Sequence, residues 1–279
     1  MRTIVHLSDL HFGRTDASLL DPLAAIVLSV APDLIAVSGD LTQRARTWQF
    51  KQARAFLDRL PMPQVIVPGN HDVPLYDVVT RFTRPLARYR RYISDDLEPW
   101  FIDDEIAVMG INTARSLTFK RGRINEAQID RMETRMRALH EGIAKIVVAH
   151  HPIDLPTGYP LDELVGRATL ARESLLTIKC DLLLAGHLHV GSAVIGGIKS
   201  GGRAHAPVVV QAGTATSTRG RAESNSFNVI MIQARQIEVR RYAWQAGAGN
   251  FEPTKSACFE RTLGGWKRAG AHTHPMHQR

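Results

Sequence analysis

Residues 64–72 read QVIVPGNHD, a β-branched apolar run followed at once by proline, glycine and the polar residues Asn70, His71 and Asp72. The apolar run predicts a buried strand over residues 64–67. Gly69 allows the sharp turn that such a segment needs where the strand ends. The polar side chains therefore stand at the carboxyl end of a strand, where buried sheets open into a ligand-binding crevice.

Four other segments repeat this arrangement of an apolar strand and a polar end. Predicted strands 3–7, 34–37, 145–149 and 181–185 run into SDLH (residues 8–11), SGD (38–40), HHP (150–152) and GHLH (186–189). Because the carboxyl ends of neighbouring strands meet at one edge of a sheet, we expect the five polar ends to converge. The candidate metal ligands are Asp9, His11, Asp40, Asn70, His150, His187 and His189.

This donor set indicates two metal ions. Imidazole and carboxylate ligands without thiolate suit Mn, Fe, Zn or Co. Seven ligands are too many for one tetrahedral ion but suit two ions that share a bridging carboxylate, an arrangement known for phosphoryl transfer. Each motif alone is weak, because Asp-x-His and Gly-Asp are common in loops, so the prediction rests on all five together.

The rest of the chain predicts an α/β protein with a β-rich last third. Helices are expected over 19–30, 47–60, 75–92 (broken near Pro85) and 125–141, where Asn125 is a candidate N-cap. Strands 192–195, 207–211, 227–233 and 236–244 follow with little helix between them. Two sheets packed face to face with helices outside would accommodate both parts.

We expect one domain over residues 1–264 and a flexible basic tail over 265–279. Two segments, about 73–100 and 153–177, are expected to act as caps around the site. They would carry the substrate specificity, which no motif in them reveals.

Composition and charge narrow the classes of protein. The 279 residues are 44% hydrophobic and 22% charged, as in ordinary globular domains, and carry a net charge of +8. This basic balance suits anionic substrates, nucleic acid or an anionic membrane, and the arginine run at residues 81–91 is either a membrane-facing or a solvated helix face. Two cysteines exclude a disulfide scaffold, and the longest apolar stretch, 23–30, is too short to span a bilayer. With no signal peptide visible, we expect a cytoplasmic protein.

The five motifs in this order resemble the signature of the calcineurin-like metallophosphoesterases over about residues 1–245. SDLHFG at 8–13, Asn112-Thr113 and Gly122-x-Ile124-x-x-x-Gln128 look most like the branch of class III cyclic-nucleotide phosphodiesterases and glycerophosphodiesterases. The resemblance implies the metallophosphoesterase fold, a four-layer sandwich of two mixed β-sheets flanked by helices. It also implies a metal-dependent phosphodiesterase, a phosphoric ester hydrolase.

The resemblance further implies a role for each residue. One ion would bind Asp9, His11 and His189, the second would bind Asn70, His150 and His187, and Asp40 would bridge them. His71 would contact the phosphate or the leaving oxygen, and Asp72 would orient its ring. His151 is a candidate for lining the substrate side, or for packing beside Pro152, and Arg115 is a candidate phosphate ligand or ordinary surface charge.

The expected reaction is direct attack of a metal-bound hydroxide on a small phosphodiester, such as a 3',5'-cyclic nucleotide or a glycerophosphodiester. One alternative is a hydrolase of a membrane-associated lipid pyrophosphate or phospholipid-like substrate, which would bring a membrane surface into contact with the basic segments. Another is a non-catalytic metal-binding scaffold, although His71 would then have no purpose. Nucleic acid is not an expected partner, because no aromatic-rich binding stretch is present.

Overall fold

The computed structural model describes residues 1–156, 158–197, 205–218 and 223–269. Its first sheet has seven strands in the order β13-β12-β11-β10-β1-β2-β3. The three strands β1, β2 and β3 are parallel to one another, and the others pair antiparallel. The bounds are β1 (Arg2–Leu7), β2 (Leu34–Ser38), β3 (Gln64–Val67), β10 (Ser226–Gln233), β11 (Gln236–Gln245), β12 (Asn250–Thr262) and β13 (Gly265–Arg268).

The second sheet has six strands in the order β4-β5-β6-β7-β9-β8. The four strands β5, β6, β7 and β9 are parallel, and β4 and β8 close the two edges antiparallel. The bounds are β4 (Trp100–Ile102), β5 (Ile106–Ile111), β6 (Ala144–Ala149), β7 (Leu182–Ala185), β8 (Ser192–Ile195) and β9 (Val208–Gln211).

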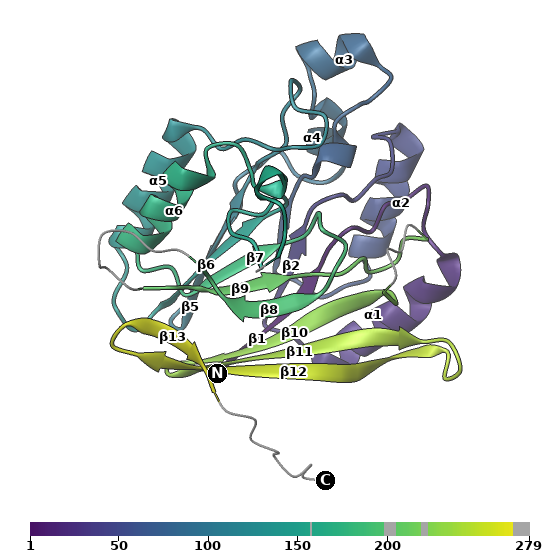
Figure 1. Cartoon of the computed structure of the whole chain (residues 1–279). Coiled ribbons are helices and arrows are strands. Elements are labelled where there is room, and N and C mark those ends of the chain that lie inside the picture. The colour runs from purple at the N-terminus through teal and green to yellow at the C-terminus, as the bar shows by residue number, and fades with distance from the viewer. Residues whose placement is uncertain (157, 198–204, 219–222, 270–279) are drawn as a thin grey trace.

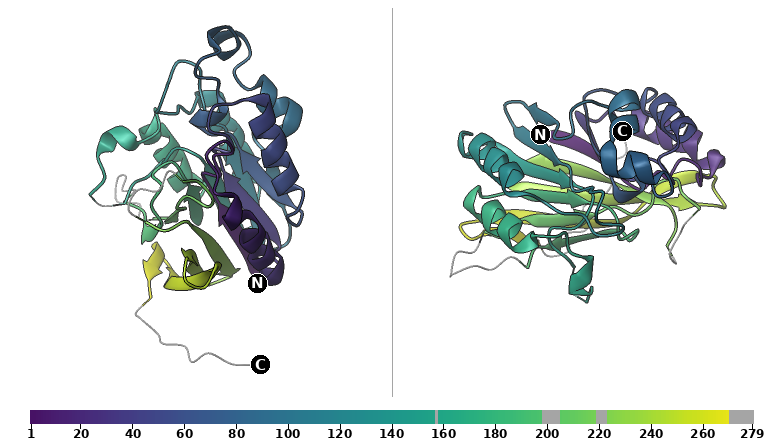
Figure 2. Two further views of the ribbon diagram at one scale, coloured as in Figure 1. Left: turned by 90° about the vertical axis from the view of Figure 1, so that its right-hand side faces the viewer. Right: turned by 90° about the horizontal axis from the view of Figure 1, so that it is seen from above.

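Helices cover both outer faces of the sheet pair (Figures 1 and 2). Figure 1 shows α1 and α2 on one side and α5 and α6 on the other, while α3 and α4 stand at the top. The bounds are α1 (Leu20–Val30), α2 (Thr47–Leu57), α3 (Val78–Thr83), α4 (Ala87–Tyr92), α5 (Glu126–Arg137) and α6 (Ala168–Thr177), with 3-10 turns η1 (Ala17–Leu19), η2 (Asn70–Asp72) and η3 (Leu161–Glu163).

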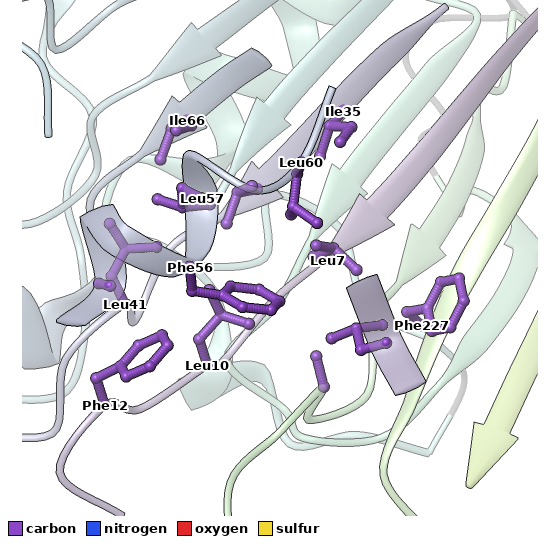
Figure 3. Packing of buried hydrophobic residues seen from close by; sticks show 14 of the residues in the cluster. Leu7, Leu10, Phe12, Ile35, Leu41, Phe56, Leu57, Leu60, Ile66 and Phe227 are labelled. Atoms are coloured by element: carbon purple, nitrogen blue, oxygen red, sulfur yellow. The ribbon is translucent and has the colours of Figure 1, made fainter. Parts of the chain in front are cut away.

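Side-chain alternation along the strands explains the four layers. In β2, Ile35 and Val37 face the helices α1 and α2, whereas Leu34 and Ala36 face the other sheet. In Figure 3, Phe56 and Leu57 of α2 lie against the same cluster as Leu7 and Ile35. A third apolar cluster joins α5 and α6 to the outer face of the second sheet. The expected sandwich of two mixed sheets between helices is confirmed.

The chain after Gln245 differs from the expectation. Residues 250–262 form β12, which the sequence did not suggest because Pro253 and a run of exposed polar residues break the apolar alternation. The predicted flexible tail is wrong for Gly265–Arg268, which form β13. Trp266 is buried there, and its Nε1 donates to Asp181 Oδ1 over 3.0 Å. Ala269 donates its N–H to the Cys258 carbonyl over 2.8 Å, and residues 270–279 of the predicted tail lie outside the described residues.

The basic run at residues 81–91 is not one continuous helix face. It is split between α3 and α4 around Pro85, as the proline predicts. Arg81 is buried and donates to the carbonyls of Pro74, Ser116 and Thr118. Arg88 pairs with Asp77 over 2.7 Å, while Arg84, Arg90 and Arg91 are exposed. Two arginines of the run, Arg81 and Arg88, therefore make contacts within the fold.

Candidate metal centre

The predicted ligands follow five strand ends, drawn from both sheets. The loops after β1, β2 and β3 of the first sheet meet the loops after β6 and β7 of the second. The ligands are Asp9 and His11 after β1, Asp40 after β2, Asn70 after β3, His150 after β6, and His187 and His189 after β7. The sheet-to-sheet packing thus brings together residues up to about 180 positions apart, as the sequence predicted.

One group of ligand atoms joins four of these residues. Asp9, His11, Asp40 and His189 each offer an atom within 4.8 Å of the others. Asp9 Oδ1 lies 3.4 Å from His11 Nε2 and 3.2 Å from His189 Nε2. Asp40 Oδ2 lies 3.7 Å from His11 Nε2. These are the predicted ligands of the first ion together with the predicted bridging carboxylate.

A second group of ligand atoms adjoins the first through Asp40. His150, His151 and His187 offer ligand atoms within 4.8 Å of one another. His150 Nε2 lies 3.3 Å from Asp40 Oδ2 and 3.2 Å from Asn70 Oδ1. Asp40 therefore stands between the two groups, as a bridging carboxylate must. His151, expected on the substrate side, lies within the second group.

Five ligands have a backbone conformation that is unusual for their residue types. Asp9, His11, Asp40, His187 and His189 all have φ between 48° and 71°. Such left-handed geometry costs about 1–3 kcal/mol at a non-glycine residue and concentrates at functional sites. The turns that follow the strands thereby determine the directions of these five side chains.

A close backbone approach completes this geometry at Gly69. A Cβ atom at that position would lie 2.1 Å from Asp40 Oδ1, so no larger residue fits there without displacing the Asp40 carboxylate. The glycine at the start of the 69–72 motif is therefore a packing requirement of the bridging position.

Buried polar atoms without partners mark the centre of the site. Among the described residues, Asp9 Oδ1, both ring nitrogens of His11 and His151 Nε2 have no hydrogen-bond partner. Their side chains are almost wholly buried, so each unsatisfied group is expensive unless something binds it. Metal ions would satisfy the Asp9 oxygen and the lone pair on one nitrogen of each ring, and the mixed nitrogen and oxygen donors suit first-row transition metals. The residues therefore fit a metal centre.

Hydrogen bonds on the far side of the rings fix which nitrogen faces the site. His150 Nδ1 lies 2.7 Å from the Ser38 carbonyl oxygen, and His189 Nδ1 lies 2.8 Å from Thr214 Oγ1. In both residues Nε2 is left toward the carboxylates. Such outer contacts set the ring orientation in metal sites.

Charges within the site keep its carboxylates ionised. Burial opposes ionisation of Asp40, but His150, His71 and His11 hold its pKa well below the usual value. Burial likewise opposes ionisation of Asp9, yet His189 and His11 lower its pKa. Both carboxylates are therefore ready to bind a cation.

The histidines of the second group divide by environment. Burial disfavours the charged imidazole, but Asp40 raises the pKa of His150 to about 9. Burial and the neighbouring His150 lower the pKa of His187 to about 4 and that of His151 well below its usual value. An ion held by His150 and His187 would need an unprotonated nitrogen on each ring, so its binding would compete with protonation of His150.

His71 lies beside the first group of ligand atoms and contacts two of its members. Its backbone N–H donates to Asp40 Oδ1 over 2.8 Å, and its ring meets His11 edge-on with centroids 4.9 Å apart. Its Nδ1 lies 2.9 Å from the Gln43 carbonyl oxygen and 3.2 Å from Arg44 Nη1. His71 is only partly buried, unlike the ligands Asp9, His11 and Asp40.

The described hydrogen bonds of Asp72 go to groups other than the His71 ring, so its role in orienting that ring stays a prediction. Asp72 accepts instead from the backbone N–H groups of Leu41, Thr42 and Gly69 and from the Thr42 hydroxyl. It faces inward because these donors line the turn after β2. Asp72 therefore braces the two turns that carry Asp40 and Asn70, while the Gln43 carbonyl oxygen contacts Nδ1 of His71.

Arg115 is held away from the ligand cluster by its described contacts. Its Nη1 donates to the carbonyls of Asn112 and Ala114, and its Nη2 donates to Gln128 of α5. None of these contacts joins it to a predicted ligand, and its role in substrate binding remains a prediction.

The sequence assigned no role to several residues near the ligands. Gln43 and Arg44 come three and four residues after Asp40, and this closeness to the Gly39-Asp40 motif is a signal that could have found them. Thr113 Oγ1 lies 2.7 Å from His151 Nδ1, and Glu163 Oε2 lies 3.5 Å from His187 Nε2. Thr214 and Glu163 carry no motif, because only the packing of distant loops brings them near the site.

The chain matches a family model and one curated relative. A model described as calcineurin-like phosphoesterase matches residues 2–191. The glycerophosphodiester phosphodiesterase GpdQ of Enterobacter lignolyticus (strain SCF1) is 30% identical over 124 residues, which are 37% of this chain and 44% of that protein. The match thus spans less than half the length of this relative.

Two solved structures share the fold. The purple acid phosphatase PPD1 of yellow lupin (Lupinus luteus) superposes with a TM-score of 0.68 at 12% identity over 92% of this chain and 53% of its own. A dimetal phosphatase from Danio rerio superposes with a TM-score of 0.64 at 14% identity over 86% and 95%. At such identities the likeness concerns the fold alone.

Proposed function

The chain belongs to the calcineurin-like phosphoesterase family, and we propose that it hydrolyses phosphodiester bonds with two divalent metal ions. The observation that carries this proposal is the position of Asp40 between two groups of ligand atoms, with His71 bonded to the same carboxylate. A metal-binding scaffold would need the two groups but would have no use for a partly exposed histidine beside them.

The protein's own residues would bind the metals and the substrate. The first ion would be held by Asp9, His11 and His189 and the second by Asn70, His150 and His187, with Asp40 shared. Bound divalent ions supply Lewis acidity, which activates water and neutralises phosphoryl charge. No side-chain nucleophile is needed, and hydrolysis is direct.

His71 would give a proton to the leaving oxygen. When Nδ1–H donates to the Gln43 carbonyl, the proton on Nε2 is present only in the charged ring. Releasing that proton returns the ring to a neutral form that is still held by Gln43. General acid assistance of this kind contributes about 10²–10⁴-fold when the leaving group is a basic alkoxide.

The preferred substrate class is a small phosphodiester, such as a 3',5'-cyclic nucleotide or a glycerophosphodiester. The likeness to the protein named a glycerophosphodiester phosphodiesterase supports this choice. A lipid pyrophosphate or phospholipid-like substrate is the second candidate, since large apolar side chains are exposed in the segment that follows the motif at residues 69–72. Nucleic acid is not proposed.

The test is a comparison of matched substrates with the Mn-, Fe-, Zn- or Co-loaded protein. We expect faster turnover of bis(4-nitrophenyl) phosphate than of 4-nitrophenyl phosphate at each pH and metal, and turnover of a cyclic nucleotide or a glycerophosphodiester ahead of a nucleotide pyrophosphate or DNA. A consistent preference for the monoester would refute the diesterase proposal. Absence of any metal-dependent turnover would favour the scaffold.

A further inference from the structure

Five large apolar side chains are exposed on two segments that pack against each other. They come from α3 and from the loop after β5, and we call them the α3 patch: Val78 (58% exposed), Val79 (74%), Phe82 (53%), Leu117 (82%) and Phe119 (63%). Single exposed apolar residues are ordinary, but a group of this kind on one surface marks a binding surface.

Arg81 makes the two halves of the patch contiguous. Its Nε donates to the Ser116 carbonyl over 2.8 Å and its Nη2 to the Thr118 carbonyl over 3.3 Å. Its guanidinium also lies 4.3 Å from the centre of the Phe119 ring. Since Arg81 is itself part of α3 and is buried, the 116–119 loop is fixed against this helix.

Both segments of the α3 patch lie close in sequence to residues of the metal centre. α3 begins a few residues after Asp72, and the loop begins just after Thr113, whose hydroxyl contacts His151. Figure 1 shows α3 standing out from the body of the molecule, and the right view of Figure 2 looks onto this end. Short stretches of chain therefore join both segments of the patch to residues of the metal centre.

All the charged side chains of the segment that contains α3 and α4 are positive. Residues 78–91 contain five arginines and no acidic residue. Two of these arginines are held within the fold, but Arg84, Arg90 and Arg91 are exposed. Apolar side chains next to exposed cations are the combination by which short amphipathic segments insert into anionic bilayers.

We infer that the α3 patch docks the protein on an anionic lipid surface, with Val79 and Phe82 entering the interface and Arg84, Arg90 and Arg91 contacting lipid headgroups. A second copy of the chain fits this surface less well. A two-fold contact places the same patch on itself, so the arginines of both copies would face one another. This docking goes beyond the proposed reaction and does not depend on turnover.

Vesicle binding tests the inference directly. We expect the metal-loaded full chain to sediment with vesicles of phosphatidylcholine containing phosphatidylglycerol, less with pure phosphatidylcholine, and less as salt rises. The double variant Val79→Ser, Phe82→Ser should lower the partition coefficient about tenfold or more, because two partly inserted side chains lose their apolar transfer free energy. Arg84→Gln should weaken binding to the anionic vesicles alone.

Leu28→Ser is the matched control, because Leu28 is 54% exposed but lies on α1, away from the patch. It should bind vesicles as the wild type does. Melting temperatures of all variants show whether each is folded. Failure of the wild type to bind anionic vesicles, or equal binding by the double variant, overturns the inference. So does a wild-type dimer that the double variant converts to monomer in sedimentation velocity. A failed diesterase assay would leave the vesicle result standing.

Discussion

The backbone N–H of His71 donates to Oδ1 of Asp40 over 2.8 Å, so the residue proposed as the proton donor is positioned by the carboxylate proposed to bridge the metals. The other oxygen, Oδ2, lies 3.3 Å from His150 Nε2. The Asp40 carboxylate thus positions the predicted metal ligand His150 and the proposed proton donor His71 relative to each other. Any displacement of Asp40 would disturb both.

Metal content tests the bridging role of Asp40. We expect two ions per wild-type chain at saturation and loss of at least one ion in Asp40→Asn, because an amide binds cations more weakly than a carboxylate. The asparagine oxygen can still accept the His71 N–H, so the fold should persist. Metal analysis after gel filtration gives the stoichiometry. Asp181→Asn, a buried carboxylate on the opposite end of β7, should retain both ions, and a two-ion Asp40→Asn protein would contradict the bridge.

His71→Ala should reduce turnover without releasing metal. Its ring is not in either group of ligand atoms, so metal analysis of the variant should match the wild type. The loss should reach about 10²–10⁴-fold for alkyl diesters, whose leaving alkoxide needs a proton, and be smaller for nitrophenyl diesters. Equal losses for both leaving groups would instead mean that His71 stabilises phosphoryl charge.

The buried His6 side chain should make the folded state less stable as the pH falls. It is fully buried in β1, with Nε2 2.9 Å from Ser38 Oγ, and burial lowers its pKa to about 3 from 6.5. The unfolded chain therefore binds a proton between these pH values that the folded chain does not. The stability contributed by the neutral ring is present above about pH 6.5 and is lost as pH falls toward 3, by up to about 1.4 kcal/mol per pH unit.

Urea unfolding of wild type and His6→Gln between pH 4.5 and 8 measures this slope. The glutamine side chain can still bond to Ser38 but does not titrate. Both proteins should be compared with chelator present, so that metal release does not enter the difference. Parallel stability curves for the two proteins would show that His6 is not responsible.

Asp181 anchors the C-terminal hairpin to the second sheet. It is buried and accepts from Trp266 Nε1, Arg261 Nη2 and the Lys145 N–H. Asp181→Ala should lower the free energy of unfolding by about 2–4 kcal/mol, because it leaves these donors unpaired. Glu260→Ala removes an exposed pair with Lys267 and should change stability by at most about 1 kcal/mol. Similar effects of both changes would contradict the anchoring role.

The sequence predicts the metal centre better than its surroundings. Each ligand follows an apolar run closely, and β3 begins and ends at the expected residues, because buried parallel strands are short, apolar and sharply bounded. The inward turn of Asp72 and the burial of Arg81 could not be predicted. Both depend on carbonyl and N–H groups supplied by loops far away in sequence.

The C-terminal strands escaped prediction for a related reason. β12 is largely exposed, so its residues need no apolar alternation, and β13 is held by Trp266 and its distant partner Asp181. Alternation of apolar and polar residues shows only which face of a strand is buried. It cannot predict a hairpin that is held in place by one buried tryptophan, Trp266.

The left-handed turns at Asp9, His11, Asp40, His187 and His189 link the lifetime of the protein to the supply of metal. Glycine would suit the backbone better at each of these five positions, and the chain places carboxylate or imidazole there at the expense of folding free energy. Metal ions that bind only the folded chain would offset that deficit by mass action. When metal is scarce, the unfolded fraction rises and proteolysis removes it, so the abundance of the enzyme would follow the availability of its ions.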